Sequence, residues 1–175
     1  MSYFLFGVVR LAGLTEGELD EFGWRMVGAG SELRLFVLVG PNVTQPPVRD
    51  ILRELDQLGG DDLPFMLTTS PLRDTSHELI SPYQVAGGDL RVVRDSLGRV
   101  GTWLERVSEL QGVRGIQLFT SEGYDTSFAE SESSPAGLAE QVMERLEGTC
   151  DLPSLRIHVT LPGQAGTEVA RQDPV

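Results

Sequence analysis

Polar side chains able to bind a metal ion or a charged partner are concentrated in residues 120–134, which read TSEGYDTSFAESESS. The stretch follows an apolar run at 113–119 and consists largely of hydroxyl and carboxyl groups. Its carboxylates could offer oxygen ligands to a hard cation such as Ca²⁺. Their spacing matches no calcium-binding loop, and Gly123 does not stand where such a loop needs its glycine. We therefore predict no metal site and no cofactor.

The chain has two histidines, and each has two interpretations. His77 lies within Asp74–Glu78, where it could act as a base oriented by a carboxylate or as part of a metal corner. Triad residues normally converge from separate elements, so a polar loop with an Asx turn is the alternative. His158 lies on the polar side of a predicted strand, with Arg156 and Thr160. Its two interpretations are a hydrogen-bonded spacer and an acid–base group. No catalytic residue is predicted.

Several kinds of catalytic and binding site are excluded by the composition of the chain or by motifs that it lacks. All 14 cationic residues are arginine, so the chain cannot form a lysine Schiff base or supply a P-loop lysine. The turn at 28–30 precedes a predicted strand and lacks the third glycine of a dinucleotide-binding loop. Residues 95–98, DSLG, lack the first glycine of a nucleophile elbow. Cys150 is the only cysteine, so the sequence allows no intrachain disulfide.

Charge points to the class of partner. With 26 acidic residues against 14 cations, the net charge is −12, which argues against nucleic acid and favours a basic protein. Aromatic residues among the carboxylates of 120–134 fit a protein interface, where aromatic side chains anchor and charge steers. A solvated loop ahead of a helix is the alternative. The predicted partner-binding residues are Glu122, Tyr124, Asp125, Phe128, Glu130 and Glu132.

The elements that must position these residues follow from hydrophobic periodicity. Thr15 and Glu18 form a capping box that begins a helix reaching about residue 27. Three further helices are predicted over 47–58, 97–110 and 135–146, and strands over 3–9, 33–39, 65–69, 90–93, 113–119 and 154–161.

This order reads βαβαβ twice, which predicts two pseudo-repeated halves, 1–69 and 83–162, joined by an irregular connector at 70–88. The motif Val-Val-Arg recurs at 8–10 and 92–94, and Trp24 corresponds to Trp103. We expect an α/β or α+β fold with helices packed on a mixed or mostly parallel sheet. Residues 1–162 form one domain in this prediction, and the tail 163–175 is disordered.

The predicted halves suggest where a ligand would bind. The stretch 120–134 leaves the end of a predicted strand, and the loop 40–46 occupies the equivalent place in the first half. In α/β sheets, ligands bind beyond the carboxyl ends of the strands.

Two function classes follow. The first is a bacterial, cytoplasmic, non-enzymatic partner-binding protein, an immunity-type inhibitor or adaptor that binds a basic protein through its acidic surface. The second is a small-molecule enzyme or ligand-sensing domain that uses a cleft between the halves with His77 or His158. A homodimer formed through a sheet edge is a further alternative. No membrane span is expected, since no apolar run approaches about 18 residues.

Overall fold

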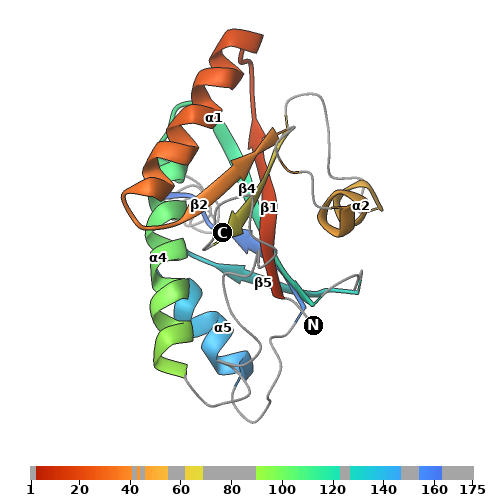
Figure 1. Ribbon diagram of the computed structural model, residues 1–175, viewed down its shortest axis with the longest axis vertical. Helices are drawn as coiled ribbons and strands as arrows, with labels where there is room; N and C mark the ends of the chain where they lie inside the picture. Colours follow the sequence, from red (N-terminus) through yellow and green to blue (C-terminus); the bar gives the residue numbers. More distant parts are fainter. Residues whose placement is uncertain are drawn as a thin grey trace, which may run out of the picture.

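A six-stranded mixed sheet and four helices form the described part of the chain (Figure 1). The computed structural model describes residues 3–40, 43, 46–54, 62–68, 90–122, 127–146 and 154–162. The helices are α1 (Glu16–Ser31), α2 (Pro46–Glu54), α4 (Leu90–Ser108) and α5 (Leu138–Leu146). The strands are β1 (Tyr3–Leu11), β2 (Phe36–Val39), β3 (Asp62–Thr68), β4 (Val113–Glu122), β5 (Ala129–Ser133) and β6 (Leu155–Val159).

The strands lie in the order β2-β3-β1-β4-β6-β5. Four of the five pairings are antiparallel, and only β5 and β6 run parallel. The predicted α/β class is therefore confirmed with a mixed sheet, and the alternative of a mostly parallel sheet is wrong. Both predicted halves contribute strands to this one sheet, because β1 pairs with β4 along its whole length.

The larger core lies between one face of the sheet and helices α1, α4 and α5 (Figure 1). Its centre is Trp103, which is fully buried and whose indole N–H donates to the carbonyl oxygen of Met26 at 2.9 Å. The Trp103 ring also meets Phe65 edge to face, with 5.0 Å between ring centroids. One side chain thus ties α4 to both α1 and the sheet.

The opposite face of the sheet is divided into an apolar part and a polar part. Helix α2 packs over the apolar part, where Phe6 of β1 stacks on Phe119 of β4 with centroids 5.3 Å apart. This second core includes no residue of β6 or β5 among those the structure describes. Because Leu155, Ile157 and Val159 of β6 point into the larger core, the alternate positions of β6 point to the polar part.

Several predicted elements are confirmed. Thr15 caps α1, accepting a hydrogen bond from the amide of Glu18 at 3.3 Å. Helix α1 continues to Ser31, past the expected end near residue 27. β6 alternates between buried and half-buried positions as its sequence predicts. No helix in the described ranges is long and apolar enough to cross a bilayer.

The pseudo-repeat is not confirmed. Residues 90–93 were expected to be a strand, but they form the first turn of α4, so the recurring Val-Val-Arg motif lies once in a strand and once in a helix. The two tryptophans also differ, since Trp24 is 70% exposed and Trp103 is buried. An apolar run as short as 90–93 does not by its pattern distinguish a strand from a turn of helix. The whole predicted connector at 70–88 and the whole tail 163–175 lie outside the described residues.

The two loops expected at equivalent strand ends leave opposite ends of the sheet. β1 is antiparallel to both β3 and β4, and β3 is antiparallel to β2, so β2 and β4 run in opposite directions. β4 is also antiparallel to both of its neighbours. The rule that places ligands beyond the carboxyl ends of parallel strands therefore does not apply to it.

Candidate functional site

The polar stretch 120–134 is largely strand and not a continuous loop. β4 extends through Glu122, which is the register partner of Tyr3, and residues 129–133 form β5 at the edge of the sheet. Phe128, Glu130 and Glu132 are described. The predicted partner-binding residues Tyr124 and Asp125 lie outside the described residues, as does the candidate base His77.

β5 is a strand of alternating serine and glutamate. Ser131 and Ser133 point inward and are buried, and the Ser131 hydroxyl accepts a hydrogen bond from the side-chain amide of Gln141 in α5 at 2.9 Å. Glu130 and Glu132 point to the opposite face and are exposed. Small hydroxyl side chains replace the usual apolar residues on the inner face, and their polar groups remain hydrogen-bonded. The period of two was therefore present in the sequence without its usual hydrophobic signal.

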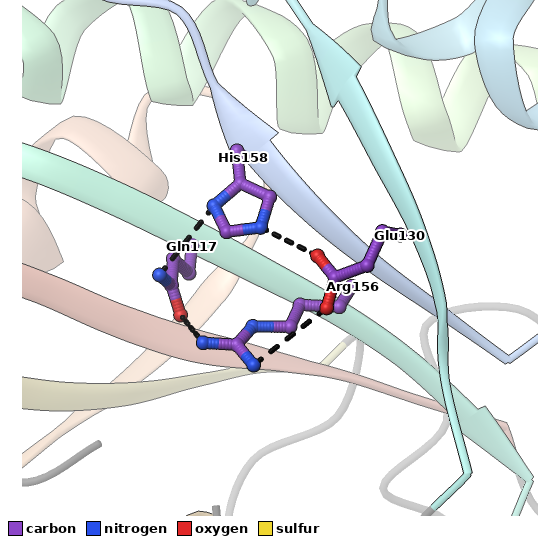
Figure 2. Close-up of polar contacts among 4 residues, drawn as sticks. All are labelled: Gln117, Glu130, Arg156 and His158. Carbon is purple, nitrogen blue, oxygen red and sulfur yellow. Dashed lines mark hydrogen bonds and ion pairs between the residues drawn. The ribbon is translucent and has the colours of Figure 1, made fainter.

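Figure 2 shows the four residues that meet on the polar part of the sheet: Gln117 of β4, Arg156 and His158 of β6, and Glu130 of β5. The register sets this arrangement, because Gln117 is paired with His158 and Glu130 with Arg156. His158 Nε2 lies 2.6 Å from Glu130 Oε2, and Arg156 NH1 lies 3.7 Å from Glu130 Oε1. We call these four residues the polar cluster. It unites one predicted partner-binding residue, Glu130, with one predicted acid–base candidate, His158.

Hydrogen bonding within the polar cluster orients the imidazole. The Gln117 carbonyl oxygen accepts from Arg156 at 3.2 Å, which leaves the Gln117 amide N–H₂ group facing His158 Nδ1 at 3.5 Å. Nδ1 must then be the acceptor, so the neutral ring carries its proton on Nε2 and donates it to Glu130. Both ring nitrogens therefore face a partner inside the cluster.

Arg156 connects the polar cluster to the apolar part of the face. Its guanidinium carbon lies 5.8 Å from the centroid of the Phe119 ring, and only 20% of its side chain is exposed. Among the described residues, the buried Nε atom of Arg156 has no hydrogen-bond partner, whereas NH2 donates to Gln117 and NH1 faces Glu130. The Glu130 carboxylate thus already faces two groups of the chain itself, the Arg156 guanidinium and the His158 imidazole.

Phe128 and Glu132 complete the candidate surface. Phe128 lies half-buried against Phe119, with ring centroids 5.3 Å apart, so its ring extends the second core toward β5. Glu132 is exposed and forms no ion pair with any described residue. Within the described ranges, no three acidic, histidine or cysteine side chains gather as metal ligands would.

Comparisons with known proteins add no relative. No family model, no curated protein and no solved structure matches the chain. A function for the chain must therefore be inferred from the geometry of the polar cluster and of strand β5.

Proposed function

We propose that the protein is a non-enzymatic partner-binding protein that meets a basic protein at strand β5, in the manner of an immunity-type inhibitor or adaptor. The observation that carries the proposal is the pair of exposed glutamates, Glu130 and Glu132, side by side on one face of an edge strand. An edge strand can accept a partner's backbone while its outward side chains select the partner by charge. The net charge of −12 supports a basic partner.

The two glutamates have different parts in this proposal. Glu132 has no ion pair in the described ranges, so its charge is available to a cation of the partner. Glu130 already faces Arg156 and His158, and a partner arginine would have to compete with both. Glu130 therefore contributes mainly by neutralising Arg156, whose uncompensated charge would repel a basic partner.

Acid–base catalysis by His158 is the second candidate, because the 2.6 Å contact with Glu130 resembles the orienting contact of a catalytic base. One observation weighs against it. The other ring nitrogen faces Gln117, where a catalytic base would face its substrate. The proposal of partner binding is therefore preferred.

A capture experiment tests the proposal. Immobilised wild-type protein and two double variants are exposed to an extract of the source organism, and retained proteins are quantified by mass spectrometry. Glu130→Gln with Glu132→Gln removes two charges from β5, and Glu105→Gln with Glu109→Gln removes two exposed charges from the region of α4. The matched variants have equal net charge and differ only in the face they alter.

We expect wild type and the Glu105/Glu109 control to retain the same basic protein, released by salt, and the Glu130/Glu132 variant to lose it. Equal retention by both double variants would remove β5 from the proposal. Retention of a partner that is acidic and insensitive to salt would contradict its electrostatic basis.

A further inference from the structure

A surface cavity of about 620 Å³ lies between α1 and the ends of β2 and β3, on the helical side of the sheet. It belongs to the edge that is farthest from β5 in the strand order, so it is separate from the polar cluster. Its volume falls within the range of small-molecule pockets, about 300–1,000 Å³. The residues that line it include Glu16, Asp20, Gly23, Trp24, Val39 and Leu63.

Trp24 stands at this cavity with 70% of its surface exposed. Helix α1 packs on the sheet through Phe22, Met26 and Gly30, so Trp24 lies outside its buried stripe. An exposed indole contributes little to folding, because its apolar surface remains in water. Aromatic faces at pockets are used to bind cations and apolar groups.

Two glycines of α1, Gly17 and Gly23, line the cavity. A Cβ atom at Gly17 would meet nothing within 4 Å, and one at Gly23 would lie 3.5 Å from Val39. Gly23 lies in the interior of the helix, where a glycine costs about 1 kcal/mol relative to alanine, and no close approach of another element requires it. A side chain at Gly23 would stand at the wall of the cavity beside Trp24.

The charge of the cavity wall is negative. Glu16 and Asp20 line it with Trp24, at spacings of four residues that place all three on one face of α1. Neither acid forms an ion pair in the part of the chain that the structure describes, whereas Glu21 pairs with Arg25 at 2.7 Å. No arginine is among the residues described as lining the cavity. Glu16 also suits the first turn of a helix, but Asp20 lies beyond that turn.

We propose that this cavity binds a small organic cation with an apolar body. The ammonium or guanidinium group would lie over the face of Trp24 within reach of Asp20, and the apolar body would contact Val39 and Leu63. A purely apolar ligand would leave the carboxylates unused, and an anion would be repelled by them. The site is independent of the proposed partner surface at β5, so either proposal can fail without the other.

Three probes of equal length separate these cases: n-hexylammonium, n-hexanol and n-hexanoate. Binding is followed by the two indole N–H signals in ¹⁵N-resolved NMR spectra. The Trp103 N–H is hydrogen-bonded in the core and serves as the internal reference, whereas the Trp24 signal reports the cavity. We expect hexylammonium to shift the Trp24 signal alone and to bind about fivefold more tightly than hexanol, with hexanoate weakest.

Variants identify the groups responsible. Asp20→Asn is expected to reduce the preference for hexylammonium over hexanol. Trp24→Leu is expected to reduce it while preserving an apolar wall; because this variant lacks the reporter indole, its binding is followed by the backbone amide signal of Gly23, which also lines the cavity. Asp50→Asn, at an exposed position of α2, is the matched control and should leave the preference unchanged. The proposal would be overturned if hexanol bound as tightly as hexylammonium. It would also be overturned if hexylammonium, at its highest soluble concentration, left the Trp24 signal unshifted.

Discussion

Two glycines of the same helix should respond in opposite directions to the same substitution. In α4, a Cβ atom at Gly98 would meet nothing within 4 Å, whereas one at Gly101 would lie 2.5 Å from the carbonyl oxygen of Pro135. Pro135 belongs to the turn between β5 and α5. The close approach of α4 to this turn therefore helps to place the strand that carries the proposed partner surface.

The magnitudes follow from these contacts. Gly98→Ala adds a better helix former at an exposed position, which should raise the free energy of unfolding by about 0.5–1 kcal/mol. Gly101→Ala gains the same propensity but forces α4 and the Pro135 backbone apart, and overpacking of this kind costs about 1–3 kcal/mol or more. A net loss of about 1–2 kcal/mol is expected for Gly101→Ala, so the two variants should differ by about 2 kcal/mol.

Urea denaturation followed by circular dichroism measures both variants against wild type. For a chain of this size, a change of 1 kcal/mol also moves Tm by about 2–4 °C, which gives a second readout. Wild-type-like stability of Gly101→Ala, or a rise equal to that of Gly98→Ala, would show that α4 does not approach Pro135 as closely as the structure has it.

Two further substitutions test the core around α1. Trp103→Phe removes the hydrogen bond to Met26 and part of the packing, and should lower the free energy of unfolding by about 2–3 kcal/mol in urea denaturation. The same variant leaves exposed Trp24 as the only tryptophan, so its fluorescence emission should shift to the red; an unchanged spectrum would contradict the assignment of buried and exposed indoles. Thr15→Ala removes the cap on the amide of Glu18 and should cost about 1 kcal/mol in thermal melts, whereas Thr15→Ser should restore most of it.

Elements with a strong local signal could be predicted from the sequence. The apolar run at 33–39 contains β2, the capping box at Thr15 begins α1, and the alternation of 154–161 gives β6 with its outward Arg156 and His158. Each of these signals arises from neighbouring residues, which is why one chain suffices to detect them.

Strand β5 and the polar cluster required information that local patterns do not contain. β5 has serines where a strand normally has apolar residues, so hydrophobic periodicity predicts no strand there. The contact between Glu130 and His158 joins residues 28 positions apart, and it exists only because β5 pairs in parallel with β6. Gln117 lies within an apolar run and was not singled out as a site residue. Because its neighbours Ile116 and Leu118 are buried, alternation along the strand places its side chain on the opposite face.

The association rate of the captured partner tests the central claim most directly. Stopped-flow measurements at about 10 and 150 mM salt compare wild type with the Glu130/Glu132 and Glu105/Glu109 double variants, because exposed charges steer association strongly only at low ionic strength. At low salt, we predict about a three- to tenfold slower association for the Glu130/Glu132 variant and little change for the control, with the difference shrinking at high salt. Equal association rates for the two double variants would contradict the proposal that β5 is the surface that meets a basic partner.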